Sequence, residues 1–294
     1  MGIFACCCNV LIGKFNLVSI LHYQRHNLIR TSKAFSQATY DNRHSVVIPM
    51  SEQNSNQSQN NKEVKPKLKV LAFHGYRQNG AVFRAKIGSF RKAVNKYAQL
   101  TFISAPHKVA NDEGGGDEDG RSWWFNAEDN TFSGKCLGGP AIGFEDTLHL
   151  IEEVVKEHGP FDGFMGFSQG ACLVGLLAAI MKSVRAAILA SGFRSGSLVH
   201  KGFYDEDINL PSIHVYGESD SIIPKEMSES LISLFVSPVV MEHTGGHYVA
   251  CSGTVKDAYL DFFHERHQDL QIQCCQMGLF PLPSGYHILP LGYV

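Results

Sequence analysis

The sequence predicts an α/β fold in which helices cover both faces of a doubly wound, mostly parallel β-sheet. From Leu68 onward, apolar runs of strand length alternate with longer segments of helical periodicity, which is typical of repeated βαβ units. Apolar residues make up 44% of the chain and charged residues 18%, as in a globular protein with a real core. No internal repeat interrupts this pattern. We therefore expect one domain over residues 68–266.

The expected elements follow from runs of apolar residues and from the residues that end them. The pattern predicts strands over residues 68–73, 100–104, 163–167, 185–190, 212–216 and 239–242. It predicts helices over residues 82–97, 144–158, 169–181, 224–235 and 255–264. Gly159 suits the end of one helix, and Pro224 suits the first turn of another. A long connection without clear periodicity, residues 105–142, is expected to be functional or mobile.

The two ends of the chain differ from this domain in composition. Residues 1–67 are expected to be a disordered leader and linker, since residues 51–67 are polar and of low complexity. Residues 1–40 are basic and contain no Asp or Glu, which fits a mitochondrial transit peptide, while the alternative is a working start at Met50. The tail over residues 267–294 is atypical and has the pattern of neither a strand nor an amphipathic helix.

Charge, hydropathy and cysteine spacing limit the partners and the cellular compartment that we expect for this chain. A formal net charge of −2 gives no electrostatic basis for binding nucleic acid. The longest apolar run, residues 171–181, is too short for a spanning helix of about 20 residues, so no transmembrane segment is expected. The eight cysteines show no metal-binding or disulfide spacing, which indicates a reducing compartment. We expect a cytoplasmic protein, or a mitochondrial one if the leader is genuine.

The pentapeptide GFSQG, residues 166–170, is the strongest local signal for chemistry. It matches the pattern Gly-x-Ser-x-Gly and lies where an expected strand gives way to an apolar helix. In that context a strained turn lifts the serine hydroxyl out of the sheet, and the flanking glycines remove Cβ atoms that would collide. The motif therefore predicts that Ser168 is a nucleophile of an α/β-hydrolase fold.

The order of the remaining candidate residues agrees with this interpretation. Asp220 follows one later strand and His247 follows the next, which is the order nucleophile, acid, histidine of α/β-hydrolases. Asp220 has the alternative role of a helix N-cap, and Glu218 and Asp205 are rival acids. His243 is a rival base, although its position in the strand predicts that it points into the sheet.

The segment FHGYRQNG, residues 73–80, is predicted to complete the site. In this fold an oxyanion hole takes one N–H from the residue after the nucleophile, here Gln169, and another from a loop after an early strand. We assign the second N–H to Tyr76, and we expect His74 to brace the loop beside the substrate. The segment lacks the glycine spacing and the lysine of a phosphate-binding loop.

Together these motifs resemble one family. His-Gly-x-x-Gln-Asn, the RSWW segment over residues 121–124, GFSQG, Gly-x-x-Asp and Gly-Gly-His resemble the small serine hydrolases of fungi and animals that include the ovarian-cancer-associated esterase. The resemblance covers residues 68–266. It implies an α/β-hydrolase with a minimal cap that hydrolyses carboxylic esters, often fatty-acyl esters.

Trp123 and Trp124, in the long connection, are either core residues or an aromatic wall for an acyl chain, and we favour the wall. The expected partner is a small-molecule acyl ester, cleaved without metal or cofactor. An acyl-protein or acyl-coenzyme A thioesterase is the alternative enzyme, since it uses the same residues. A catalytically idle hydrolase fold that only binds ligands is the alternative of another class.

Overall fold

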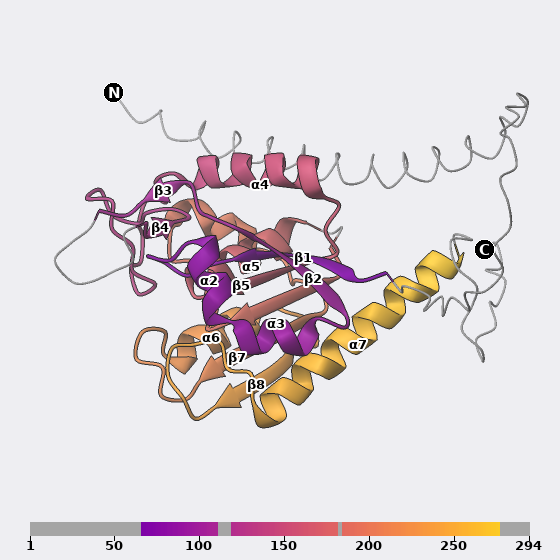
Figure 1. Cartoon of the computed structure of the whole chain (residues 1–294). Coiled ribbons are helices and arrows are strands. Elements are labelled where there is room, and N and C mark those ends of the chain that lie inside the picture. Colours follow the sequence, from indigo (N-terminus) through magenta and orange to yellow (C-terminus); the bar gives the residue numbers. More distant parts are fainter. Residues whose placement is uncertain (1–65, 111–118, 182–183, 277–294) are drawn as a thin grey trace, which may run out of the picture.

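A computed structural model describes residues 66–110, 119–181 and 184–276. Most of the leader and linker predicted over residues 1–67, and the tail beyond residue 276, lie outside the described residues. The described part contains a sheet of six parallel strands in the order β2-β1-β5-β6-β7-β8 (Figure 1). The strands are β1 Leu68–Phe73, β2 Ala98–Ile103, β5 Gly163–Phe167, β6 Ala186–Ala190, β7 Ser212–Gly217 and β8 Val239–His243.

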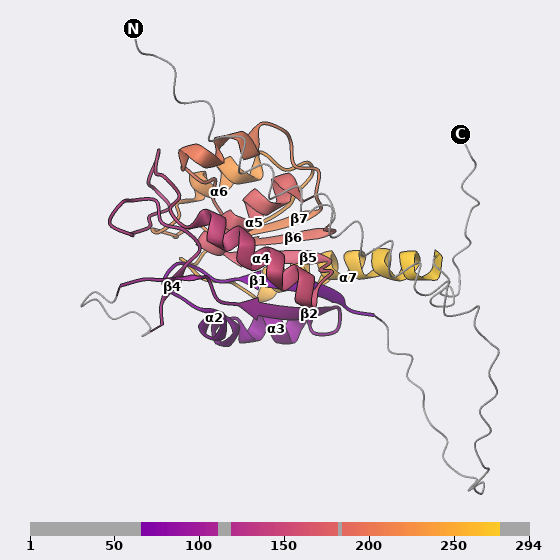
Figure 2. The ribbon, with the colours of Figure 1, turned by 90° about the horizontal axis from the view of Figure 1, so that it is seen from above.

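Alternating side chains of these strands build two cores, one on each face of the sheet. In β1, Leu71 and Phe73 belong to one core, whereas Leu68, Val70 and Ala72 belong to the other. The first core is covered by α4 Phe144–His158, α5 Gln169–Ile180 and α6 Lys225–Ile232, and the second by α2 Gly80–Lys86, α3 Gly88–Val94 and α7 Gly253–Gln276. Figure 2 shows α4, α5 and α6 on the side of the sheet opposite α2 and α3. The predicted doubly wound α/β fold is therefore confirmed.

The strand order reverses beside β1, and this reversal places the candidate site. The chain passes from β1 to β2 on one side, whereas β5 pairs with β1 on the other side. At such a switch point the loops after the two central strands part and leave room for a ligand at the carboxyl edge. Here these loops are residues 74–80 after β1 and the turn at Ser168 after β5, with Phe73 in register with Gly166.

The long connection contains little regular structure in its described part. It carries β3 His107–Lys108 and β4 Arg121–Ser122, which pair antiparallel. A 3-10 helix, η1 Leu198–Tyr204, lies between β6 and β7. The described residues form no separate cap domain above the sheet, which agrees with the minimal cap that was expected.

Two helices differ from the prediction. The helix expected over residues 82–97 is two helices, because the backbone leaves the helical region at Ile87, with φ −99° and ψ 34°, just before Gly88. The last helix, α7, continues to Gln276, well past the end expected at His264 and into the tail in which no helix was expected. His267 is buried there, with its ring 5.7 Å from that of Tyr97, so tertiary packing supports the extension.

Buried histidines link the stability of this fold to pH. Burial lowers the pKa of His200 and of His214 from 6.5 to about 3. As the pH falls from about 6.5 towards 3, these two histidines therefore bind protons in the unfolded chain but stay neutral in the folded chain. The free energy of unfolding falls in that window, and each histidine contributes up to about 1.4 kcal/mol per pH unit.

We predict that His214→Gln flattens the loss of stability below pH 6, because glutamine does not titrate and can still bond to Ser212. Urea unfolding at pH 7, 6 and 5 measures this slope. His149→Gln, an exposed change on α4, is the matched control and should leave the slope as it is. Equal slopes for wild type and His214→Gln would contradict the assignment of the buried histidine.

Candidate active site

Ser168 lies on a strained turn between β5 and α5. Its backbone has φ 54° and ψ −116°, a conformation that costs a non-glycine residue about 1–3 kcal/mol. The turn is held because Ser168 N–H donates to Ala190 O (2.9 Å) and Ser168 O accepts from Cys172 N–H (2.9 Å). A Cβ on Gly166 would collide with the Gly170 backbone, so the strand and the helix can approach only with glycine there.

A continuous chain of hydrogen bonds joins Ser168, His247 and Asp220. His247 Nε2 lies 3.0 Å from Ser168 Oγ, and His247 Nδ1 lies 2.7 Å from Asp220 Oδ2. The other oxygen of Asp220 accepts from the backbone N–H groups of Ile222 (3.0 Å) and Ile223 (2.8 Å). The carboxylate side chain is fully buried, so it has a single fixed orientation towards the imidazole. This geometry allows the imidazole to take a proton from the serine.

The rival residues occupy other positions. Glu218 and Asp205 are exposed, and no contact joins either carboxylate to His247 in the described structure. The His243 ring accepts a hydrogen bond from Gly245 N–H (3.1 Å) and packs on Tyr248 with ring centroids 4.9 Å apart. Asp220 is not the N-cap of α6, which begins later, at Lys225, after Pro224. Its carboxylate closes the turn before this helix instead, by accepting from Ile222 N–H.

Two backbone segments, the start of α5 and the loop after β1, meet at the serine. Gln169 is the first residue of α5, so its N–H has no acceptor within the helix. A Cβ built on Gly75 would lie 3.4 Å from Ser168 Cβ, which shows how closely the loop after β1 approaches the nucleophile. The next peptide N–H along this loop belongs to Tyr76. The two donors assigned from the sequence thus lie on the two segments that meet at Ser168.

His74, expected beside the substrate, is instead a buried bracing residue. It is 0% exposed, and burial lowers its pKa to about 4. The neutral ring accepts from Ala105 N–H at Nε2 (2.9 Å) and therefore donates from Nδ1 to Gly75 O (2.8 Å). The bracing part of the expectation agrees with these contacts, whereas a fully buried ring cannot touch a substrate.

The aromatic wall expected from Trp123 and Trp124 is corrected by their burial. Their side chains are 0% and 1% exposed and belong to the core beneath the site. Trp123 packs on His74 with ring centroids 4.8 Å apart, and its Nε1 donates to His74 O (2.8 Å). The sequence pattern could not separate the two roles, because a core under a loop and a wall beside a ligand both call for large aromatic residues.

Two apolar residues that no sequence motif marks, Phe132 and Ile222, lie close to the assigned residues in space or along the chain. Phe132 is half-buried and packs against Tyr76 (ring centroids 5.4 Å apart) and towards Phe193 (6.3 Å). Ile222, next but one to Asp220, is 56% exposed. Phe132 lies in an aperiodic segment, so no pattern in the sequence marked it.

Two further features concern only residues 66–110, 119–181 and 184–276. No group of three or more His, Cys, Asp or Glu side chains in them could hold a metal ion. No helix among them is both long enough and apolar enough to cross a membrane.

The fold and the serine turn at the carboxyl edge define the class of protein as an α/β-hydrolase. A family model described as "Serine hydrolase (FSH1)" matches residues 64–259, and the chain belongs to this family of serine hydrolases. The predicted resemblance is thereby confirmed.

Two named relatives with at least 40% identity agree with this membership. The chain is 49% identical over 215 residues to Esterase CG5412 of Drosophila melanogaster, with 70% of this chain and 77% of that protein covered. It is 40% identical over 217 residues to Esterase OVCA2 of Danio rerio, with 66% and 96% covered. Among solved structures, Zea mays acyl-protein thioesterase 2 is similar with a TM-score of 0.49 and 15% identity, over 70% of this chain and 96% of that one.

We predict that Asp220→Asn lowers kcat on an ester substrate by about three to four orders of magnitude, because the amide no longer holds His247 in the useful tautomer. Glu218→Gln, two residues away and exposed, is the matched control and should stay within about twofold of wild type. Steady-state kinetics on p-nitrophenyl butyrate compares them. A crippled Glu218→Gln beside a mild Asp220→Asn would move the acid role to Glu218.

Proposed function

We propose that the protein is a serine carboxylesterase that cleaves medium- to long-chain acyl esters through an acyl-enzyme on Ser168. The observation that carries the proposal is the chain of hydrogen bonds from Ser168 Oγ through His247 to Asp220, with distances of 3.0 and 2.7 Å. These distances support the proposal, because acyl transfer requires a nucleophile, a base and an orienting acid within hydrogen-bonding reach of one another.

In the first half of the reaction, His247 Nε2 takes the proton of Ser168 as its oxygen attacks the ester carbonyl. Asp220 stabilises the imidazolium that forms, because its Oδ2 faces Nδ1. The backbone N–H groups of Tyr76 and Gln169 donate to the tetrahedral oxyanion, and the loss of one such donor costs about 3–4 kcal/mol of barrier. The imidazolium then protonates the leaving alcohol, and the acyl group stays on Ser168.

In the second half, water replaces the alcohol. His247 takes a proton from this water as the water attacks the acyl-enzyme carbonyl. The same two N–H groups donate hydrogen bonds to the oxyanion that forms. Collapse of the tetrahedral intermediate returns the proton to Ser168 Oγ and releases the carboxylic acid. Each step uses side chains and backbone groups of this chain together with substrate and water.

The preference for longer acyl chains rests on the apolar residues around the site. Phe132 packs against Tyr76, which follows Gly75 in the loop that approaches Ser168, and Ile222, two residues after Asp220, is exposed. Each methylene group of substrate buried against such residues contributes about 0.8 kcal/mol. Where this burial is realised in the transition state, kcat/KM rises with chain length.

The first test concerns the nucleophile. We predict that Ser168→Ala abolishes both ester hydrolysis and labelling by a fluorophosphonate probe while leaving the circular dichroism spectrum unchanged. Ser195→Ala is the matched control, because Ser195 Oγ also lies 2.7 Å from a histidine, Nδ1 of His200, and it should keep both activities. Labelling that persists in Ser168→Ala would show that another residue is the nucleophile. A wild type that takes no label would favour the catalytically idle fold.

The second test concerns the acyl chain. We predict that kcat/KM rises from p-nitrophenyl acetate through butyrate to octanoate, and that Phe132→Ala weakens this rise by removing apolar contact area. Phe90→Leu is the control: Phe90 is buried against Tyr259 in the core on the other face of the sheet, so its loss should affect stability without changing the preference. A flat profile in wild type would contradict the acyl-binding role. Thiol esters of the same acyl groups, run in parallel, distinguish a thioesterase by a higher kcat/KM on sulfur.

A further inference from the structure

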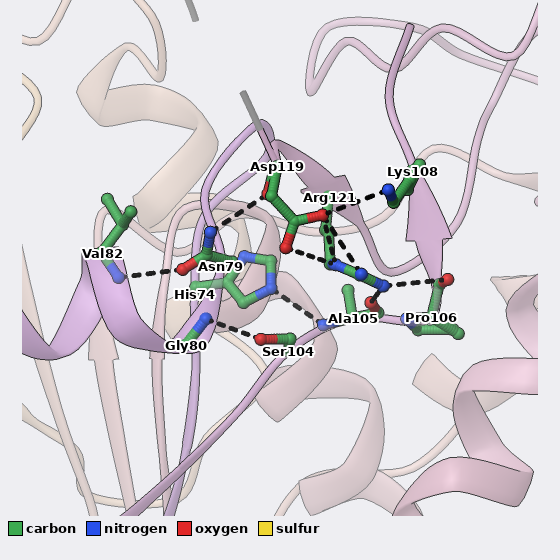
Figure 3. Close-up of polar contacts among 10 residues, drawn as sticks. All are labelled: His74, Asn79, Gly80, Val82, Ser104, Ala105, Pro106, Lys108, Asp119 and Arg121. Carbon is green, nitrogen blue, oxygen red and sulfur yellow. Dashed lines mark hydrogen bonds and ion pairs between the residues drawn. The ribbon is translucent and has the colours of Figure 1, made fainter. Parts of the chain in front are cut away.

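Polar contacts hold both ends of residues 74–80, the loop that carries Tyr76 (Figure 3). At the start of the loop, His74 accepts from Ala105 N–H (2.9 Å). At its end, Asn79 Nδ2 donates to the Asp119 carbonyl (3.1 Å), and Gly80 N–H donates to Ser104 Oγ (3.1 Å). The loop is therefore fixed at both ends to segments that come from the long connection and from the end of β2.

Between these ends, β4 contacts the loop through backbone hydrogen bonds. Arg77 N–H donates to Arg121 O (2.9 Å), and Arg121 N–H donates to Gln78 O (2.8 Å). These bonds form an antiparallel bridge directly beside Tyr76. The backbone of Arg121 thus holds the two residues that directly follow Tyr76.

The continuation of the same segment contacts the other proposed donor. The Gln169 side chain is fully buried, and its Oε1 accepts from Trp123 N–H (3.1 Å) while its Nε2 donates to Trp124 O (2.8 Å). Residues 121–124 therefore bond on one side to the loop of Tyr76 and on the other side to Gln169. One short segment connects both N–H groups that are assigned to the oxyanion.

The side chain of Arg121 fixes this segment in place. Its Nε lies 3.2 and 3.1 Å from the two carboxylate oxygens of Asp119, and its Nη1 donates to the carbonyls of Ala105 (3.2 Å) and Pro106 (3.4 Å). The guanidinium thus crosslinks the start of the segment to the end of β2, where Ala105 also contacts His74. The Arg121 guanidinium also holds the pKa of Asp119 below its usual value.

We propose that Arg121 and Asp119 are positioning residues for the oxyanion hole: their ion pair holds residues 121–124, and this segment aligns the N–H groups of Tyr76 and Gln169. This inference rests on the proposed esterase function. Alignment matters because the donors must lie 2.7–3.1 Å from the oxyanion, a range that shifts of well under 1 Å exceed. The oxyanion exists only in the transition state and the tetrahedral intermediate, so a loosened hole lowers kcat and leaves KM largely unchanged.

The test compares Asp119→Asn, Arg121→Gln and the double variant of the full chain with wild type on p-nitrophenyl butyrate. We expect each change to lower kcat by about tenfold, a fraction of the 10²–10³-fold loss of a whole donor, with KM within about twofold. The double variant should be no worse than Arg121→Gln alone, because both residues act through one contact. Asp119→Glu, which keeps the charge, should retain most of the activity.

A second measurement separates alignment from stability. An alkyl trifluoromethyl ketone forms a tetrahedral adduct with the serine, so its inhibition constant should rise in the variants by the factor by which kcat/KM falls. Arg185→Gln is the matched control: it breaks the ion pair of a similarly exposed arginine to Asp162 (3.5 Å), and both of these residues directly precede strands, at the amino ends of β5 and β6. It should lower the melting temperature and leave kcat and the inhibition constant unchanged.

Three outcomes would overturn the inference while the proposed function stands. The first is an unchanged kcat in both variants, the second is a change in KM alone, and the third is an equal loss of kcat in Arg185→Gln. In each case, hydrolysis by the wild type still depends on Ser168. A wild type without hydrolysis that depends on Ser168 would overturn the proposed function and this inference together.

Discussion

The close approach of α5 to the end of β1 is the contact on which the rest of the site depends. A Cβ on Gly170 would collide with the carbonyl oxygen of Phe73 and come within 2.6 Å of that of His74. Only glycine lets the first turn of the helix press against the strand beside it. The strained backbone of Ser168 follows from this approach, since the chain must turn sharply between β5 and a helix packed so tightly. The same approach brings the loop after β1 against the nucleophile.

The parts of the molecule that could be predicted from the sequence are those whose signal is local. Each strand of the parallel sheet is a short apolar run, because helices cover both of its faces, and all six predicted strands are present with small shifts at their ends. The order of Ser168, Asp220 and His247 along the chain was readable because each follows a strand and therefore lies at the same edge. The geometry that joins them agrees with that order.

The remaining parts depend on contacts between distant residues, which leave no periodic pattern. Burial of Trp123 and Trp124 depends on the packing of residues 121–124 between His74 and α4, and nothing in the local sequence distinguishes that from exposure. The break at Ile87 results from a single residue leaving the helical region, in a stretch whose apolar spacing continues across the break. The extension of α7 depends on His267 reaching Tyr97, far away in the sequence.

Gln169 has two roles that cannot be varied separately. Its backbone faces the nucleophile, whereas its side chain bonds to Ser122, Trp123 and Trp124 in the interior. A glutamate there would place a buried charge against the Trp124 carbonyl, and a leucine would leave the Trp123 N–H without an acceptor. Comparable proteins should therefore differ at residue 169 only together with residues 122–124. A redesign that replaced Gln169 within the pentapeptide GFSQG, residues 166–170, and left residues 122–124 unchanged would fail for the same reason.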